Sequence, residues 1–278
     1  MTHYEILQVS PRAEASVIKA AYRALVKSNA NDNRHMLSLN AAYEVIGDED
    51  KRARYDKERN EQIGKIIGQY RILSLIAEGG FGKTYLGEHL ILKTPVCIKH
   101  ASAVSTFDEQ IMYEEAKAIW DLRHFGMPAI RDLLKLSDGS VVLIMSYIPG
   151  PTLQQLVEKH HKIDPEHVAW IADRIFNVLR YLHLHGVVHG DVKPHNIIIQ
   201  PERHQVVLVD YGLSMIRPVS DGNNKGYTPY FASPEQMNGG TLLPESDFYG
   251  LGMSLVSALG GNIENKSIPV SVPDPMIL

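Results

Sequence analysis

The feature that most constrains this chain is a short polar motif between apolar runs, VVHGDVKPHNIII at residues 187–199. Asp191 and Asn196 stand five positions apart with Lys193 between them, and Asp210 ends a second apolar run fourteen residues after Asn196. A carboxylate can orient a hydroxyl proton, an amide or carboxylate oxygen can ligate a hard cation, and an ammonium can neutralise phosphate charge. Turn capping alone gives no reason for this order and these spacings.

A second group of chemically useful residues precedes this motif. The turn GGFGKTY lets backbone amides approach phosphates closely because no Cβ intervenes, and its glycines are Gly79, Gly80 and Gly82. Lys99 lies on a predicted strand, VCIK, and a helix about sixteen residues later carries the adjacent carboxylates Glu114 and Glu115. Either carboxylate could pair with Lys99 and orient its ammonium toward an anion, because spacing alone does not choose between them.

Composition narrows the class of protein. The apolar share of 44% and charged share of 22% are ordinary for a globular protein, and a net charge of −4 indicates neither a nucleic-acid nor a membrane surface. No apolar run approaches the roughly 18 residues of a membrane span, and the N-terminus is too polar for a signal peptide. The single cysteine, Cys97, excludes an internal disulfide framework. We therefore expect a cytoplasmic protein.

The pattern of elements predicts an α+β fold. From Gln69 onward, YRILSLIA, the segment after the glycine turn and TPVCIKHA read as short strands joined by tight turns, which favours an antiparallel sheet. Residues 106–124 and 165–186 read as helices, the second with Pro165 in its first turn and Gly186 as its stop. A further helix is expected around residues 246–260. A sheet-rich part thus precedes a helix-rich part, with a cleft expected between them.

With these motifs in place, residues 70–260 resemble the eukaryotic-like protein kinases. The resemblance implies that Asp191, in His189-Gly190-Asp191, is the catalytic base and that Lys193 assists at the γ-phosphate. It implies that Asn196 and Asp210 hold Mg²⁺, the latter in Asp-Tyr-Gly instead of Asp-Phe-Gly. The segment TPYFASPEQ, residues 228–236, resembles the loop that positions the substrate, and Asp247 resembles the aspartate that anchors the catalytic loop.

The same resemblance implies an ATP site. Gly79, Gly80 and Gly82 would cover the phosphates, Ala77 replaces the family's first loop glycine, and Lys99 would contact the α and β phosphates and pair with Glu115. The hinge against adenine would run from Met145, the gatekeeper, to Ile148. The ATP-binding residues implied in this way are Ala77, Gly79, Gly80, Gly82, Thr84, Cys97, Lys99, Glu115, Met145, Tyr147 and Ile148.

Three departures from the kinase pattern carry expectations of their own. Gly190 replaces the arginine that binds a phosphorylated activation loop, so we expect activity without loop phosphorylation. After the last predicted helix only GNIENKSIPVSVPDPMIL follows, so the helical lobe is shortened and the arginine partner of Glu235 is absent. A truncated chain, a minimal kinase and a domain completed by a partner all fit, and each leaves apolar surface exposed. The His-Gly-Asp triplet is also common in small-molecule phosphotransferases.

These features leave several functions open. A protein kinase acting on Ser or Thr comes first, since Lys193 favours these hydroxyls over Tyr. A pseudokinase or scaffold is favoured by the shortened lobe and opposed by the complete set Lys99, Glu115, Asp191, Asn196 and Asp210. A small-molecule kinase is opposed by Gly212 and by residues 228–236. The protein-kinase hypothesis implies ATP and Mg²⁺ as cofactors and a protein substrate whose identity the sequence does not give.

The first 60 residues form a different region. Ile18, Ala21, Tyr22 and Leu25 fall at helical spacing, and the same spacing recurs at Leu39, Ala42, Tyr43 and Ile46, before a stop at Gly47. Two antiparallel amphipathic helices could bury these faces against each other. Residues 3–56 resemble a J-domain, the co-chaperone module, in the motifs YEILQVSP, IKAAYRALVK and LNAAYEVIGDEDKRARYD.

The J-like region departs from its family at the decisive place. The family's His-Pro-Asp tripeptide, needed to stimulate the heat-shock ATPase partner, is Ala30-Asn31-Asp32 here. The resemblance therefore implies a binding or spacer module without co-chaperone activity. Lys19, Arg23 and Lys27 form one basic stripe, which is either a solvated helix face or a docking surface for a chaperone-type or other protein.

The expected domain boundaries follow from these regions. We expect a J-like helical domain at residues 1–60, a linker at 61–68 and a kinase-like domain at 69–278. The second domain would divide into an N-lobe at 69–146 and an incomplete C-lobe at 147–278. The linker contains no Pro or Ser, and residues 59–63 could extend the preceding helix.

Overall fold

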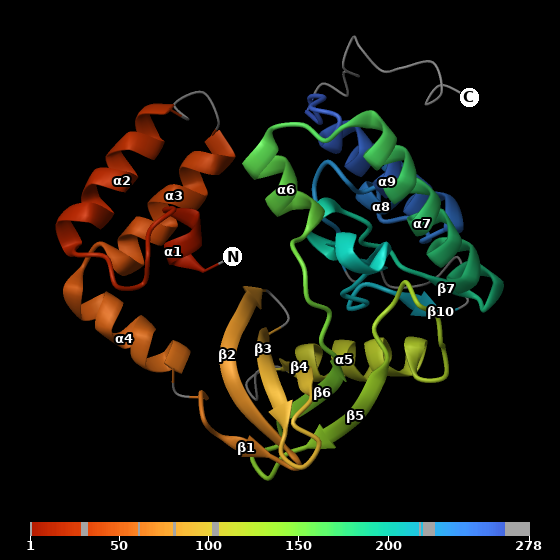
Figure 1. The fold of residues 1–278 in the computed structure, drawn as a ribbon, viewed down its shortest axis with the longest axis horizontal. Helices are drawn as coiled ribbons and strands as arrows, with labels where there is room; N and C mark the ends of the chain where they lie inside the picture. The colour runs from red at the N-terminus through yellow and green to blue at the C-terminus, as the bar shows by residue number, and fades with distance from the viewer. Residues whose placement is uncertain are drawn as a thin grey trace. The chain divides into compact units, whose positions relative to one another are not determined.

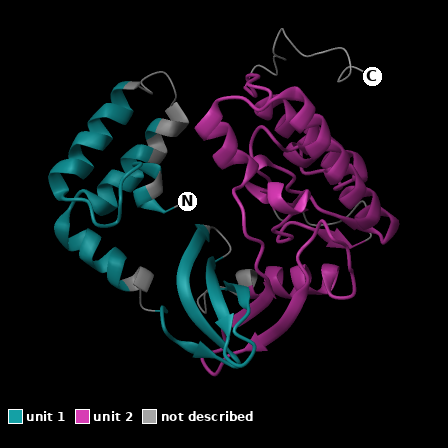
Figure 2. Cartoon of the chain, viewed as in Figure 1, with its two compact units in different colours: residues 1–102 teal, residues 103–278 magenta. Residues whose placement is uncertain are grey.

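The fold is described from a computed structural model, which covers residues 2–28, 33–60, 62–79, 82–101, 106–216 and 226–264, together with Pro218. Chain contacts divide the protein into two compact units, residues 1–102 and residues 103–278 (Figure 2). The first unit contains the J-like helices and four strands, and the second contains a hairpin and most of the helices (Figure 1). Helices and antiparallel strands together make the α+β class that the sequence predicted.

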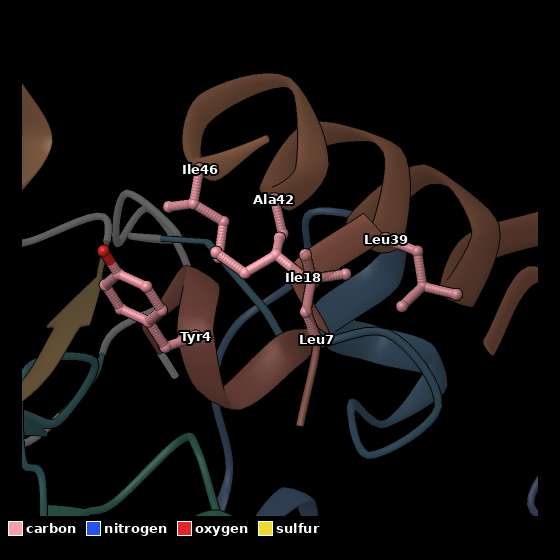
Figure 3. Close-up of a cluster of buried hydrophobic side chains, with 6 residues drawn as sticks. All are labelled: Tyr4, Leu7, Ile18, Leu39, Ala42 and Ile46. Carbon is pink, nitrogen blue, oxygen red and sulfur yellow. The ribbon is translucent and has the colours of Figure 1, made fainter. Parts of the chain in front are cut away.

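Four helices build the J-like region. They are α1 (His3–Ile6), α2 (Ala15–Ser28), α3 (Asn33–Ile46) and α4 (Glu49–Asn60). Their shared core is a cluster of buried side chains, Tyr4, Leu7, Ile18, Leu39, Ala42 and Ile46 (Figure 3). The predicted helix faces are confirmed, because Ile18 of α2 and three residues of α3 lie in this core. The missing His-Pro-Asp positions, Ala30 to Asp32, lie outside the described residues.

A polar network closes the J-like region from α4. The Tyr4 hydroxyl donates to both carboxylate oxygens of Asp56, at 2.7 and 2.8 Å, and Arg52 Nε donates to the Tyr4 hydroxyl at 2.9 Å. The Arg52 guanidinium also donates to the carbonyls of Pro11 and Ala13. Charge-assisted hydrogen bonds of this kind are stronger than neutral ones. The aromatic and charged residues of α1 and α4 therefore fix the four-helix arrangement that the apolar core permits.

The strands of the first unit form an antiparallel meander. Its members are β1 (Ile66–Ile67), β2 (Tyr70–Gly79), β3 (Gly82–His89) and β4 (Pro95–His100). Each strand pairs with the next, as predicted for the segment after Gln69. Helix α4 ends at Asn60 and residues 62–64 form a turn, so the predicted helical extension to Ile63 is wrong. Gly64, at φ 86°, adopts a conformation that glycine reaches without steric cost.

The second unit begins with a helix and a hairpin. These are α5 (Thr106–Ile119), β5 (Ile130–Lys135) and β6 (Val141–Ser146), with β5 and β6 antiparallel. Helix α5 ends five residues before the predicted limit of 124. Two helices follow, α6 (Leu153–His160) and α7 (Pro165–Leu184). Asp164 caps α7 by accepting from Glu166 N at 3.0 Å, Pro165 opens it, and Gly186 follows its end at φ 75°, as the sequence predicted.

Short elements after α7 carry the polar motif. They are β7 (Val187–Val188), the 3₁₀ helix η1 (Pro194–Asn196), β8 (Ile197–Gln200), η2 (Pro201–Arg203), β9 (Gln205–Leu208) and β10 (Met215–Ile216). Strands β8 and β9 form one antiparallel pair, and β7 and β10 form another. The last helices are α8 (Pro234–Met237) and α9 (Pro244–Ala258). The antiparallel β8–β9 pair reverses the chain after η1, so that the chain comes back to η1 just before Asp210.

The core of the second unit lies where α7 packs against α9 (Figure 1) and against β9. The buried side of α7 repeats at helical spacing through Val168, Ile171, Ala172, Ile175, Val178, Leu179 and Leu182. On the outer side, Phe176 of α7 and Phe248 of α9 are 48% and 41% exposed, and their ring centroids lie 5.8 Å apart. These two helices therefore present an exposed aromatic pair on their outer side. Among the described residues, no helix combines the length and apolarity needed to cross a lipid bilayer.

Candidate active site

Asp191 lies in the polar segment 189–196, which we call the catalytic loop after the kinase resemblance, and its carboxylate belongs to a closed ring of polar contacts in the second unit. Lys193 Nζ lies 2.7 Å from Asp191 Oδ2 and donates to Thr228 Oγ1 at 2.8 Å, while that hydroxyl donates to Asp191 Oδ1 at 2.6 Å. Asp191 is only 8% exposed, so these contacts fix its orientation. The arrangement places a carboxylate and an ammonium side by side, with a hydroxyl bound to both. It can orient an incoming hydroxyl and neutralise charge beside it.

Asn196 completes this group from the end of η1. Its Nδ2 donates to the Asp191 carbonyl at 2.9 Å and to Asp191 Oδ2 at 3.0 Å. The other polar atom of the amide is its carbonyl oxygen, a ligand type that hard cations prefer. The sequence therefore correctly grouped Asp191, Lys193 and Asn196. It placed Thr228 only within the predicted substrate-positioning segment 228–236, and the contacts of Thr228 with Asp191 and Lys193 were missed.

The second carboxylate reaches this loop through a backbone link. Val209 N donates to the Asn196 carbonyl at 2.8 Å, which fixes the residue before Asp210 against η1. Asp210 has φ 65°, a left-handed conformation that costs about 1–3 kcal/mol for a residue other than glycine and recurs at functional sites. The following residue, Tyr211, is fully buried, and burial raises its pKa well above the usual value. Its hydroxyl donates to Leu208 O at 3.2 Å.

The donor types of Asn196 and Asp210 are of the kind that magnesium takes from proteins. Among the residues that the structure describes, no group of three or more His, Cys, Asp or Glu side chains could hold a metal ion. Mg²⁺ typically takes only one or two protein carboxylates and completes its shell with water and substrate phosphates. Asp210 and Asn196 would supply one carboxylate and one amide oxygen of this type. A triphosphate-bound Mg²⁺ therefore fits these residues.

Asp247, near the start of α9, anchors the catalytic loop. It accepts from Gly190 N at 2.7 Å through Oδ1 and from His189 N at 2.9 Å through Oδ2, and His183 Nε2 lies 2.8 Å from Oδ2. Asp247 is 1% exposed, so its carboxylate has exchanged water for these partners. This confirms the anchoring role that the sequence gave it. No local sequence pattern had indicated that His183 takes part in this anchor.

His189 belongs to the same anchor. It is fully buried, and burial lowers the pKa of its imidazole, while the carboxylates of Asp247 and Asp191 oppose that shift. Its Nδ1 accepts from Asp191 N at 3.2 Å, so the proton of a neutral ring resides on Nε2. The ring also lies 4.7 Å from that of Tyr211, measured between centroids. His189 thereby connects the catalytic loop with the Asp-Tyr-Gly segment.

Near the end of the predicted substrate loop, residues 228–236, the carboxylate of Glu235 forms a hydrogen bond with a nearby serine. Ser246 Oγ donates to Glu235 Oε1 at 2.6 Å and accepts from Leu243 N at 3.1 Å. Partial burial raises the pKa of Glu235, but hydrogen bonds from Ser246 and Ser233 outweigh it and leave that pKa below its ordinary value. The usual arginine partner was expected to be missing. Instead, the hydroxyl of Ser246, at the start of α9, donates a hydrogen bond to this carboxylate.

Several predicted ATP residues share one row of the meander in the first unit. Ala77 pairs with Thr84, and Thr84 pairs with Lys99, so their side chains project from the same face of the strands. Cys97, two residues before Lys99, belongs to this face as well. Lys99 is 8% exposed. The register thus brings together four residues that the kinase resemblance assigned to nucleotide binding.

For the glycine turn, the structure describes the two flanking residues, Gly79 and Gly82. Gly79 pairs with Gly82 across β2 and β3, and next to them Glu78 lies 3.4 Å from Lys83. Gly82 has φ 119°, and a Cβ there would collide with the His100 carbonyl oxygen, so only glycine fits. Gly80 lies outside the described residues.

The remaining predicted ATP residues belong to the second unit. Met145 is buried at the end of β6, and Tyr147 and Ile148 follow it, partly exposed. Glu115 of α5 is fully buried and accepts from Tyr211 N at 3.2 Å. Lys99 and Glu115 fall in different units. Their pairing, and the ATP site as a whole, remain predictions.

Comparison with known proteins agrees with the fold and the site. Residues 70–267 match the family model described as "Protein kinase domain", and residues 2–56 match the one described as "DnaJ domain". The first match covers most of the chain, so this protein belongs to the protein kinase family. The J-like helices are similar to the DnaJ domain and form the N-terminal region of the chain.

Curated relatives include several bacterial kinases. Serine/threonine-protein kinase pkn3 of Myxococcus xanthus is 31% identical over 222 residues, which is 75% of this chain and 41% of that protein. Serine/threonine-protein kinase PrkC of Bacillus subtilis is 31% identical over 72% of this chain and 32% of that protein. PknL of Mycobacterium bovis is 32% identical over 70% and 50%. The chain therefore spans half or less of the length of these relatives.

Proposed function

We propose that this chain transfers the γ-phosphate of ATP to serine or threonine hydroxyls of a protein. The observation that carries the proposal is the ring of Asp191, Lys193 and Thr228, with Asn196 bound to the same carboxylate. The similarity to serine/threonine kinases supports the class of acceptor.

Asp191 would act on the acceptor hydroxyl. Its carboxylate would accept a hydrogen bond from the hydroxyl and take up its proton as the phosphoryl group transfers. The bonds from Thr228 and Asn196 hold the carboxylate in place beforehand, so little reorganisation is needed. Lys193, beside the carboxylate, would stabilise negative charge on the group in transit.

Nucleotide would be held by residues of both units. Lys99 and the glycine turn would contact the phosphates, and Glu115 would orient Lys99. Asp210 and Asn196 would ligate Mg²⁺, which when bound shields the phosphate charge. Ala77, Thr84 and Cys97 would contact the nucleotide from the same sheet face as Lys99, and Met145, Tyr147 and Ile148 would form the hinge segment that contacts adenine.

The test is transfer of labelled phosphate from Mg-ATP to a generic acceptor protein, comparing the parent chain with Asp191→Ala. Loss of a positioned base typically costs about 10²–10⁴-fold in rate, so the variant should lose most turnover. Its affinity for ATP, measured by calorimetry, should stay close to the parent value. Equal transfer by both proteins would refute the role of Asp191. Nucleotide binding without transfer by the parent would favour a pseudokinase scaffold.

We also propose that the J-like region binds a protein partner without co-chaperone activity. Lys19, Arg23 and Lys27 are exposed along α2, whose first turn carries no acidic residue. This surface would suit an acidic partner. Reversing the charge of all three residues should abolish capture of such a partner while the helical fold persists. Unchanged capture would mean that the stripe is merely solvated.

A further inference from the structure

Gly190, beside the catalytic aspartate, has no room for a side chain. Its φ is 78°, and a Cβ would stand 2.9 Å from Leu242 Cδ2 and 3.0 Å from the Leu213 carbonyl oxygen. Both distances are tighter than ordinary van der Waals contact, and the second neighbour is backbone. A charged side chain at this position would therefore strain the loop. Gly190 can connect to the rest of the site only through its backbone.

Both backbone groups of Gly190 are bound. Its N–H donates to Asp247 at 2.7 Å, and its carbonyl accepts from Gln236 Nε2 at 2.9 Å. Gln236 is 3% exposed, and its Oε1 accepts from Ser233 N at 3.1 Å and from Ser233 Oγ at 3.3 Å. A buried amide engaged at both ends has little freedom to turn. Gln236 thus links the end of the 228–236 segment to the catalytic loop.

The same segment contacts the loop a second time. Thr228, eight residues before Gln236, donates to Asp191 at 2.6 Å and accepts from Lys193 at 2.8 Å. The segment therefore holds two consecutive residues of the loop, Gly190 through one end and Asp191 through the other. Its far side is fixed by the Ser246 hydroxyl on Glu235. Each of these links uses an ordinary side chain and needs no phosphate.

We infer that Gln236 is a positioning residue, whose side-chain amide latches residues 228–236 onto the Gly190 carbonyl and so holds Asp191 in place for transfer without loop phosphorylation. The inference rests on the proposed phosphotransfer. It assigns to a neutral amide the coupling between loop and segment that an arginine–phosphate pair could provide elsewhere. Glutamine is suited to this place because one end of its amide donates and the other accepts.

Two substitutions isolate the latch. Gln236→Glu keeps the shape and the acceptor end, but removes the donor and sets a carboxylate against the Gly190 carbonyl. Gln236→Met keeps the approximate length and removes both polar ends. Met237→Gln is the matched control, because Met237 is the next residue and is 44% exposed. Displacement of a catalytic group by about 1 Å can cost on the order of 10²-fold in rate.

The kinetic outcome separates positioning from folding. We expect both Gln236 variants to lower kcat for transfer to protein about 10–100-fold while KM for ATP changes less than about twofold, because the predicted nucleotide contacts are untouched. Met237→Gln should match the parent. Phosphatase-treated parent, shown by intact mass to carry no phosphate, should transfer at its full initial rate without a lag. A lag that preincubation with ATP removes, or parental kcat in Gln236→Glu, would overturn the inference.

A measurement independent of activity tests the latch if the parent proves inactive, an outcome that would refute the proposed function instead. Amide hydrogen exchange over residues 187–193 should be faster in Gln236→Glu and in Gln236→Met than in the parent. Exchange over the α1–α4 segments should be the same in all three proteins. Unchanged exchange at 187–193 in both variants would overturn the inference regardless of turnover.

Discussion

The J-like helices and the catalytic loop preserve opposite parts of their respective patterns. In the J-like region the apolar framework is intact, with Tyr4, Leu7, Ile18 and Leu39 buried, yet the chemical tripeptide is absent from residues 30–32. In the catalytic loop nearly every chemical group is present and tightly bound, although one arginine is replaced by Gly190. A fold survives on apolar spacing, whereas a function depends on a few polar residues that contribute little to that spacing.

The two regions also differ in what stabilises them. The J-like core is a small cluster of apolar side chains closed by one polar network. The catalytic loop is held mainly by buried hydrogen bonds to Asp247, Gln236 and Thr228. Buried polar networks of this kind specify one geometry and are costly to break. The following variants test whether these regions respond differently to equivalent damage.

The largest effect is expected at Asp247. Asp247→Asn keeps the size but replaces one carboxylate oxygen by a donor, which opposes the N–H of His189 or Gly190. A hydrogen bond to a charged group typically contributes about 1.5–3 kcal/mol, and the carboxylate accepts from both His189 N and Gly190 N, so the free energy of unfolding should fall by about 3–6 kcal/mol. Urea denaturation measures it. Asp173→Asn, on the exposed side of α7, is the control, and an equal small effect of both would contradict the anchoring role.

The next largest effect is expected in the J-like core. Leu39→Ala removes a fully buried side chain and should cost about 2–5 kcal/mol, the range for such truncations. Hydrogen exchange should accelerate across α1–α4 and stay unchanged across residues 187–200. Acceleration in both segments would show that the two regions do not respond separately. Val17→Ala, half exposed on α2, should leave exchange at the parental rate.

Restoring the lost tripeptide tests whether the J-like framework is competent. The parent should not stimulate the ATPase of a heat-shock chaperone. The double variant Ala30→His with Asn31→Pro, which completes His-Pro-Asp with Asp32, should do so, because the helices that would present it are in place. Stimulation by the parent would contradict the predicted loss of activity, and failure of a folded double variant would mean that the framework has also diverged.

The smallest effect concerns the pH dependence of Glu235. Its pKa is lowered by folding, so the resulting stabilisation is present above the unfolded value of 4.5 and is lost as pH falls through the folded pKa. The stability gap between the parent and Glu235→Gln should therefore narrow as pH drops below 4.5. In a Ser246→Ala background the stability difference that Glu235→Gln makes should be smaller at neutral pH, because the hydroxyl that donates to Glu235 is gone. In a Ser246→Thr background, which keeps a hydroxyl, the difference should be unchanged. A gap independent of pH would exclude this linkage.

Much of this architecture could be read from the sequence because it has a local signature. The spacing of Ile18 with Leu39 and Ala42 marked two helix faces, alternation after Gln69 marked the meander, and the interval from Asp191 to Asn196 marked the loop. Pro165 and Gly186 located the ends of α7 closely. The structure and the family comparison confirm these elements and the kinase class.

The unpredicted parts share one property. Gln236, Ser246 and His183 form hydrogen bonds to residues that lie 46, 11 and 64 positions away, respectively, and a single polar residue leaves no periodicity. Helix α1 was missed for a related reason, because four residues are too few to show a helical repeat, although Tyr4 and Leu7 complete the core. Contacts of this kind are decided by tertiary packing, which local patterns do not encode.

The central claim is that the catalytic loop, despite Gly190, carries the groups that phosphate transfer needs, and transfer to identified acceptor residues tests it most directly. The parent and Asp191→Asn would be incubated with Mg-ATP and an acceptor protein, and the modified positions located by mass spectrometry. We predict phosphoserine and phosphothreonine from the parent and almost none from the variant, with nucleotide binding retained by both. Equal modification by the two proteins would contradict the account.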